Sequence, residues 1–497
     1  MKKENKKNII VFSSMILCAI LICFSFIREH FSLDTYFTYV SGYEVYAKWF
    51  LKSARVITSL IWNIAGILNI PKGIFITVNG ALCVITLSIS AFIIYKTLDK
   101  LLNNNNNNLK SILIAILSFI FIFNPMLLQN LVYAENFVMS IAVLSSCIAA
   151  SYIIKEENIT NKFIFPIILL LITTFGYQGL INVYVIFAMI LITIKYSEDI
   201  KKYIFKIINM TINYVIALGT NFVILKLINK VMFFGEIDRA NGKIDLLYNI
   251  SYPFIKLKTV LIDTCGMMPK NMFCIIIIIA LVTLMYSIYK NKPNIKRLFT
   301  GMLLAVGSYM ICFIPMLALQ KESLDASARL LFGVGAIPAV LIFLSMFYNK
   351  KNSTVVNDTI TVSLVVILIL FSINYIRVGK EHIMTNSVDL KETRQICDII
   401  NEYENNNNIK ITNIVSGKDK NPSSYVNDKV LKNELTVRVN YVDWTENILL
   451  TKEMNREFKQ RSMTEEEKKT YFNNKEYDSF SKEQIVFVDD TMYWYKY

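Results

Sequence analysis

Carboxylates and cations gather in the stretch IREHFSLDTYFTYVSGYEVYAKWFLKSARVITSLIWNI, which follows the first apolar run of the chain. Asp34 comes a few residues after that run within FSLDTYF, and Glu44 lies further along among aromatic side chains. A carboxylate against an apolar wall can act as a general base toward a hydroxyl group. Aromatic side chains suit the apolar face of a sugar ring. The stretch therefore predicts proton abstraction from a sugar hydroxyl, with Asp34 as the first candidate base.

A plainer structural interpretation stands beside each candidate acid. Asp34 could be a solvated acid at a helix end, and Glu44 could be the exposed i,i+4 partner of Lys48. The third candidate, Glu135, lies in NPMLLQNLVYAENF at the start of an apolar run, where burying a carboxylate is costly without a role. An acid in the first turn of a helix is the alternative there. The sequence leaves these alternatives open.

Two arginines and a lysine are candidate phosphate ligands. Arg55 and Arg329 both open apolar segments, and Lys321 precedes Arg329 in LQKESLDASARLLFG. A guanidinium group binds phosphate oxygens in a bidentate manner, although an arginine at a helix end can also serve as an interfacial anchor. Tyr177 and Gln178, in the turn FGYQG, are candidates for hydrogen bonds to a sugar hydroxyl, with packing of the turn as the alternative.

Metal and cofactor chemistry has little support in the sequence. His30 and His382 are the two histidines, and we expect both to be ordinary surface residues. Nucleotide-binding, zinc and Ser-His-Asp signatures are absent from the sequence. Asp489 and Asp490 could bind a divalent metal as a carboxylate pair, but such a pair more often ends a strand. We therefore predict no cofactor and leave a divalent metal open.

The elements that must position these residues are membrane spans. The chain has 497 residues, of which 54% are hydrophobic, and a mean hydropathy of +0.44. Its net charge of +14 arises from lysines clustered beside the apolar runs, which is typical of membrane topology and not of nucleic-acid binding. The fold class predicted is a polytopic α-helical membrane protein, which we place in the cytoplasmic membrane of a bacterium.

Counting runs of about twenty apolar residues gives about eleven spans. They lie near 8–27, 73–95, 110–127, 131–153, 162–175, 177–195, 206–228, 271–289, 299–319, 329–348 and 355–375. Basic residues in the alternate turns place the N-terminus in the cytoplasm, and an odd number of spans places the C-terminus outside. The run NNNNNN at 103–108 then lies in a cytoplasmic loop. The shorter segment 55–70 is expected to lie at the outer interface.

The character of the sequence changes after residue 375. We divide the chain into a transmembrane domain at 1–375 and a small extracytoplasmic α/β domain at 376–497. The stretch SVDLKETRQICDIINEYE predicts an amphipathic helix. The stretches IKITNIV, ELTVRVNYV and EQIVFVDDTMYWYKY alternate apolar and polar residues and predict strands.

Short motifs across the first domain resemble the Gtr-type glucosyl transferase II family of bacterial membrane proteins. They are SLDTYF, SARVITSLI, NPMLLQ with YAENF, FGYQGLINVY, and CFIPM with SARLLFG. The resemblance implies a C-type glycosyltransferase that moves glucose or a similar hexose from a polyprenyl-phosphate carrier to a cell-envelope glycan outside the membrane. It also places Asp34 where such enzymes carry an outer-loop acid.

Two other functions remain open at the level of sequence. A transporter or flippase of a lipid-linked glycan would be expected to show repeated halves or helices broken by Gly and Pro at corresponding positions, and the sequence shows neither. A glycan polymerase would use two lipid-linked glycans, and the sequence does not discriminate against it. The expected partners in all three cases are membrane lipid and lipid-linked sugars.

Overall fold

A computed structural model describes most of the chain, and its contacts divide that part into two compact units. The described residues are 2–32, 35, 39, 42–102, 107–155, 158–232, 245–318, 321, 324, 326–349, 353–418, 435, 438–441, 447–473, 475, 477 and 479–496. The first unit comprises Met1–Arg28 and Glu44–Arg377, and the second comprises Glu29–Tyr43 and Val378–Tyr497. Asp34, the first candidate base, lies outside the described residues.

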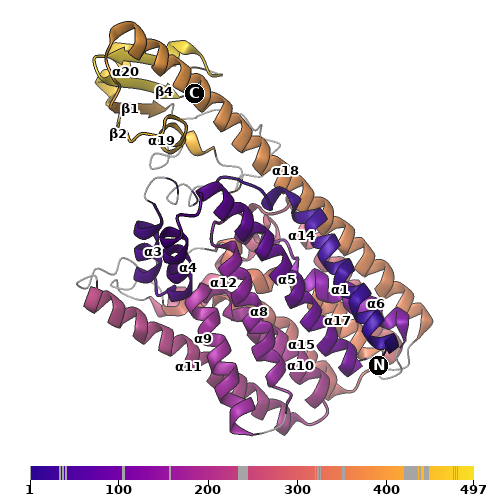
Figure 1. Cartoon of the computed structure of the whole chain (residues 1–497). Helices are drawn as coiled ribbons and strands as arrows, with labels where there is room; N and C mark the ends of the chain where they lie inside the picture. Colours follow the sequence, from indigo (N-terminus) through magenta and orange to yellow (C-terminus); the bar gives the residue numbers. More distant parts are fainter. Residues whose placement is uncertain are drawn as a thin grey trace. The chain divides into compact units, whose positions relative to one another are not determined.

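The first unit is a bundle of helices (Figure 1). In chain order the elements are α1 (Lys2–Cys23), η1 (Phe24–Phe26), α3 (Gly42–Lys52), α4 (Val56–Ile67), α5 (Lys72–Leu102), α6 (Asn108–Ile122), α7 (Leu127–Leu131), α8 (Asn136–Tyr152), η2 (Thr160–Ile164), α9 (Phe165–Tyr177), η3 (Gln178–Ile181), α10 (Asn182–Tyr196) and α11 (Ile200–Met232). They continue with α12 (Leu246–Ile255), α13 (Leu257–Leu261), η4 (Thr264–Gly266), α14 (Met272–Asn291), α15 (Ile295–Met310), η5 (Ile311–Ala318), η7 (Ala328–Leu330), α16 (Phe332–Gly335), α17 (Ile337–Tyr348) and the first part of α18 (Thr354–Asn407).

Burial separates central helices from peripheral ones in this bundle. In α10 every residue from Asn182 to Thr193 is buried, and in α17 every residue from Pro338 to Tyr348 is buried. The helix α8 packs against α5 on one side and α9 on another (Figure 1). By contrast, α1, α11 and α14 expose many large apolar side chains. A soluble monomer rarely exposes so much apolar surface, whereas lipid covers it readily.

Seven helices among the described residues are long and apolar enough to cross a membrane, which suggests membrane insertion. Each of the eleven predicted spans overlaps a helix of the first unit. The number of crossings and the sidedness of the two termini stay predictions. Helix α4 has 12 residues and reaches about 18 Å at 1.5 Å per residue, so it is too short for a hydrocarbon core of about 30 Å.

The second unit contains a four-stranded sheet with short helices. Its elements are the rest of α18, β1 (Asn413–Lys418), η8 (Val439–Tyr441), α19 (Ile448–Met454), β2 (Lys459–Ser462), α20 (Glu465–Phe472), η9 (Lys482–Gln484), β3 (Ile485–Val488) and β4 (Thr491–Lys496). The strand order is β2-β1-β4-β3, with β1 parallel to both of its neighbours and β3 antiparallel to β4. One core cluster joins Ile396 and Ile400 of α18 to Ile414 and Trp494 of the sheet.

Two sequence-based expectations for this unit are wrong. The stretch ELTVRVNYV was expected to form a strand, but its described part contains the 3-10 helix Val439–Tyr441. Val439 is buried against Phe31, Ile448 and Leu449, so contacts distant in sequence override its local alternation. His30 and His382 were expected at the surface, but both are buried, and Nε2 of His382 lies 3.2 Å from Nδ1 of His30. The stretch SVDLKETRQICDIINEYE is helical as predicted, as part of α18, which is continuous from Thr354 to Asn407.

Candidate active site

Arg55 anchors the candidate site in the first unit. It is the N-cap residue of α4 and follows Ala54, whose φ of 55° turns the chain sharply after α3. Arg55 Nη1 lies 3.6 Å from Oε1 of Glu135, and the two side chains are only 14% and 3% exposed. This distance exceeds the usual hydrogen-bond range of about 2.7–3.2 Å. The structure therefore brings two of the predicted site residues together as a loosely spaced, buried ion pair.

Aromatic rings surround the guanidinium group of Arg55. The Arg55 Cζ atom lies 4.6 Å from the ring centroid of Tyr177 and 5.9 Å from the rings of both Trp49 and Phe50. The negative face of an aromatic ring attracts a cation, and it does so without using the cation's N–H donors. The rings thus help to hold Arg55 in place and leave its donors available for oxygen ligands.

Gln178 fixes the turn on which Arg55 sits. Its Nε2 donates to the backbone oxygen of Ser53 at 2.9 Å and lies 3.4 Å from Oδ1 of Asn221 on α11. The amide of Asn221 in turn donates to the backbone oxygens of Ala54 and Thr174. These bonds satisfy backbone carbonyls where α3 ends and α4 begins. The amide nitrogen of Gln178 is therefore engaged in packing of this turn, and its role in binding a sugar hydroxyl stays a prediction.

Glu135 occupies a loop between α7 and α8 that is almost wholly buried. Asn79 of α5 donates to the backbone oxygen of Ala134 at 2.9 Å, and Asn136 donates to that of Leu131 at 3.0 Å. Glu135 is the N-cap residue of α8, and its side chain makes no capping hydrogen bond there. Its carboxylate is instead directed toward Arg55.

Arg329 reaches the same loop from the other end of the unit's sequence. Its backbone N–H donates to Oε1 of Gln129 on α7 at 2.8 Å, and its Cζ lies 4.9 Å from the ring centroid of Tyr133. A Cβ atom at Gly179 would lie 2.6 Å from Leu330 Cδ2, so η7 packs closely on the turn that follows Tyr177. The two arginines thus border one loop, residues 124–135.

Two predicted site residues lie apart from this cluster. Glu44 is exposed and accepts a hydrogen bond from Lys48 at 2.8 Å, and this bond lowers the pKa of the Glu44 carboxyl. The arrangement is the i,i+4 pair that the sequence offered as an alternative, and a lowered pKa makes a weaker base. Lys321 Nζ lies 4.5 Å from the ring centroid of Tyr248 on α12.

Metal-ligating side chains do not gather in the part of the chain that the structure describes. No group of three or more His, Cys, Asp or Glu residues suited to a metal ion is found there. Asp490 accepts hydrogen bonds from Thr412 Oγ1 at 2.6 Å and Asn413 Nδ2 at 2.8 Å, next to the turn between β3 and β4. Its carboxylate is thus engaged in joining β1 to that turn.

Sequence reasoning missed three residues of this neighbourhood: Gln129, Tyr133 and Asn221. The first two lie in NPMLLQNLVYAENF, where only Glu135 was singled out, although amide side chains are dense in that loop. Asn221 lies within the apolar helix α11, where a polar side chain is expensive unless it has a partner. Density of amides between two apolar runs is the signal that points to the loop of Gln129, and a polar residue within an apolar run is the signal that points to Asn221.

The arrangement is suited to binding an anion beside a buried polar loop. Two guanidinium groups with aromatic supports can bind phosphate oxygens, and neighbouring amide groups can bind hydroxyl groups. Comparison with known proteins gives one finding: the family model described as Glucosyl transferase GtrII matches residues 23–349, which include both arginines and Glu135. No curated protein and no solved structure matches the chain.

Proposed function

Because the chain belongs to the GtrII glucosyl transferase family, we propose that it transfers glucose or a similar hexose from a polyprenyl-phosphate carrier to a cell-envelope glycan outside the cytoplasmic membrane. The family makes the chain a glucosyl transferase. The carrier, the acceptor and the side of the membrane belong to the proposal. The observation that carries the site is the buried Arg55–Glu135 pair beneath the ring of Tyr177.

Arg55 and Arg329 are the proposed ligands of the carrier's phosphate. Arg55 Nε is buried and makes no hydrogen bond with any described residue, so a donor remains for an oxygen ligand. Both guanidinium groups lie over tyrosine rings, which restrict their motion before the ligand arrives. Preorganised cations at the leaving phosphate stabilise the charge that develops as the sugar departs.

The transfer itself exchanges one bond at the anomeric carbon. The oxygen of an acceptor hydroxyl bonds to C1 of the hexose as the bond from C1 to the phosphate oxygen breaks. The hydroxyl proton passes to a carboxylate, and the polyprenyl phosphate leaves with both electrons of the broken bond. We retain Asp34 as the proposed base on the sequence argument, since its place soon after the first span matches the outer-loop acid of C-type glycosyltransferases.

Glu135 is better suited to orienting Arg55 than to accepting a proton. Its negative charge is already set against the guanidinium group, and its loop is held by backbone contacts to Asn79 and Asn136. A buried cation with no counter-charge would be costly, so Glu135 also stabilises Arg55 in the absence of donor. Glu44, which is exposed and bound to Lys48, is the least suited of the three candidate carboxylates to act as the base.

The test is transfer by purified protein in detergent from polyprenyl-phosphate glucose, together with mass analysis of envelope glycans with and without the gene. We expect loss of one hexose from an otherwise intact polymer. Shortened polymer chains would instead identify a polymerase. In cells that lack the gene, unchanged sugar transfer from the carrier together with accumulation of the lipid-linked glycan on the inner side of the membrane would identify a flippase.

A further inference from the structure

Asn130 lies in the loop 124–135, and its buried side-chain amide makes no hydrogen bond with a described residue. It lies on α7 and is 2% exposed. Neither Oδ1 nor Nδ2 has a hydrogen-bond partner, and among the described residues it is the one amide side chain of which both polar atoms are buried in this way. Burying a donor and an acceptor without partners costs free energy, which selection rarely tolerates without a function.

A second unpartnered polar group comes from the element that packs against α7. Ser327, the N-cap residue of η7, is 8% exposed, and its Oγ makes no hydrogen bond within the part of the chain that is described. The elements α7 and η7 are in contact, and the bond from Arg329 N to Gln129 Oε1 ties them together. Two elements that meet beside Arg329 therefore each bring an unsatisfied polar side chain.

The kinds of polar atom indicate which ligand fits. A phosphate offers only acceptors, so it would satisfy the N–H donors of Asn130 but not its carbonyl oxygen. A sugar hydroxyl donates and accepts at once, and the amide of Asn130 and the hydroxyl of Ser327 can match both capacities. In a polyprenyl-phosphate hexose the sugar is bonded directly to the phosphate that Arg329 is proposed to bind.

From this arrangement we propose that Asn130 and Ser327 bind hydroxyl groups of the donor's hexose and set the choice of sugar. The assignment rests on the proposed function, because it takes the phosphate to lie at Arg329. Hydrogen bonds to sugar hydroxyls discriminate strongly, since a donor sugar that lacks the hydroxyl leaves the buried amide unsatisfied.

The decisive variant is Asn130→Leu, which keeps the branched shape of the side chain and removes both polar atoms. If the amide serves a ligand and not the fold, the variant should have an unchanged or higher Tm and a kcat/KM for polyprenyl-phosphate glucose at least tenfold lower. Asn124→Leu is the matched control in the same loop. Asn124 donates to Phe121 O at 3.0 Å and accepts from Met126 N at 3.1 Å, so its loss should lower the Tm.

Donors with single hydroxyl groups removed from the glucose give the readout that a structural role would not change. The wild-type protein should use at least one monodeoxy donor at least tenfold less well than the parent donor, and Asn130→Leu or Ser327→Ala should abolish that difference. A lowered Tm with unchanged discrimination would make Asn130 structural and overturn the assignment. Normal transfer by a stable Asn130→Leu protein would overturn it as well.

The failure of this assignment can be told apart from failure of the proposed function. In one outcome the wild-type protein is active with polyprenyl-phosphate glucose, while Asn130→Leu discriminates among deoxy donors as the wild type does. That result would overturn only the role of Asn130. A wild-type protein that transfers no hexose from this carrier, although it is folded and inserted, would overturn the proposed function and this assignment with it.

Discussion

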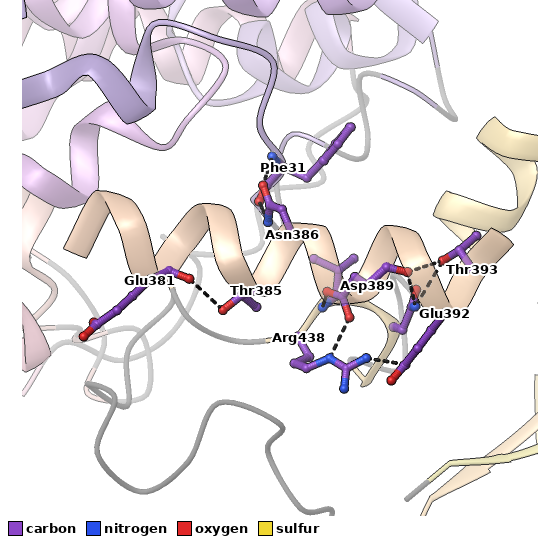
Figure 2. A network of polar contacts seen from close by, with 10 residues as sticks. Phe31, Glu381, Thr385, Asn386, Asp389, Glu392, Thr393 and Arg438 are labelled. Carbon is purple, nitrogen blue, oxygen red and sulfur yellow. Dashed lines mark hydrogen bonds and ion pairs between the residues drawn. The ribbon is translucent and has the colours of Figure 1, made fainter. Parts of the chain in front are cut away.

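Each unit contains a buried cluster of an arginine with carboxylates, and the two clusters differ in how completely the hydrogen-bonding groups of the arginine are used. In the second unit Arg438 Nε donates to Oδ1 of Asp389 at 2.7 Å, and Nη2 donates to Glu392 (Figure 2). The backbone N–H of Val439 donates to Oδ2 of Asp389 at 2.8 Å. In the first unit Arg55 lies 3.6 Å from Glu135, and its Nε makes no hydrogen bond with a described residue.

The difference indicates which buried charges serve the fold and which can serve a ligand. The cluster around Arg438 closes on itself, because guanidinium, carboxylates and backbone satisfy one another. Such a cluster contributes to structural uniqueness and has little capacity left for substrate. The cluster around Arg55 holds its cation with rings and a distant carboxylate, so its donors remain available. Burial of charge alone would not have separated the two.

The largest expected effect tests the proposed base, Asp34, which the sequence places soon after the first apolar run. An aligned general base typically contributes about 10² to 10⁴ in rate. Asp34→Asn keeps the size of the side chain but cannot take the proton, so turnover should fall by a factor in that range at unchanged Tm. Asp34→Glu should lose less. The measurement is hexose transfer by purified variants, and near-normal turnover in Asp34→Asn would contradict the base assignment.

The next prediction concerns the cluster around Arg438, in which the polar groups satisfy one another. Arg438→Ala leaves the carboxylates of Asp389 and Glu392 buried without their cation, which should cost about 3 to 5 kcal/mol of folding free energy. Denaturant unfolding of the full chain in detergent measures this loss. Arg461→Ala is the control, because Arg461 pairs with Glu467 at 51% exposure and should cost less than about 1 kcal/mol. Equal losses of folding free energy in the two variants would show that the buried cluster around Arg438 contributes no more to stability than the exposed Arg461–Glu467 pair.

Substitutions in the cluster around Arg55 should lower donor use, and Arg55→Ala should also cost stability, because it leaves the carboxylate of Glu135 buried without this cation. Arg55→Ala and Arg329→Ala each remove one side of a charge-assisted contact worth about 1.5 to 3 kcal/mol, so apparent donor affinity should fall at least tenfold. Arg297→Ala is the matched control, since Arg297 pairs with Glu198 at 2.6 Å and lies 4.7 Å from the ring centroid of Phe347. This control should lower the Tm and leave donor KM unchanged. Unchanged donor kinetics in both Arg55 and Arg329 variants would reduce these residues to interfacial anchors.

Much of the helical plan was visible in the sequence because its signal is local. Each predicted span overlaps at least one helix, and helical geometry is interrupted at Tyr177, where FGYQG separates two predicted spans. The continuity of α18 was missed because its change of composition resembles a boundary. Between 376 and 386 the residue of lowest helix propensity is Gly379, whose cost of about 1 kcal/mol is too small to break a helix supported on both sides.

The candidate site was only partly predictable for a different physical reason. Arg55, Tyr177 and Arg329 could be found because charge and aromatic character next to apolar runs stand out. The density of amides points to the loop of Gln129 and Asn130 but does not distinguish their roles, since a buried amide and an exposed amide have the same letters in a sequence. Only the contacts show that Gln129 has a backbone partner and that Asn130 has none among the described residues.

The smallest expected effect is a pH dependence within the second unit. Glu29 accepts hydrogen bonds from Tyr39 Oη at 2.5 Å and Lys452 Nζ at 3.1 Å. Burial raises the pKa of Glu29, but the two hydrogen bonds and the charge of Lys452 together outweigh burial, so the net pKa is lowered. A carboxyl with a lowered folded-state pKa contributes stability that is present above its unfolded pKa of about 4.3 and is lost as the pH falls through the folded value.

Comparison of the wild type with Glu29→Gln isolates that contribution. The wild type should be more stable by less than about 1 kcal/mol at neutral pH, because the group is partly exposed, and the difference should shrink as the pH falls from 5 toward 3. Unfolding of both proteins across this range measures it. Lys452→Met should reduce the same pH-dependent difference, since it deletes the cation that opposes protonation, while the hydrogen bond from Tyr39 remains. A difference that stays constant or grows in acid would show that Glu29 acts through packing and that its charge is not used.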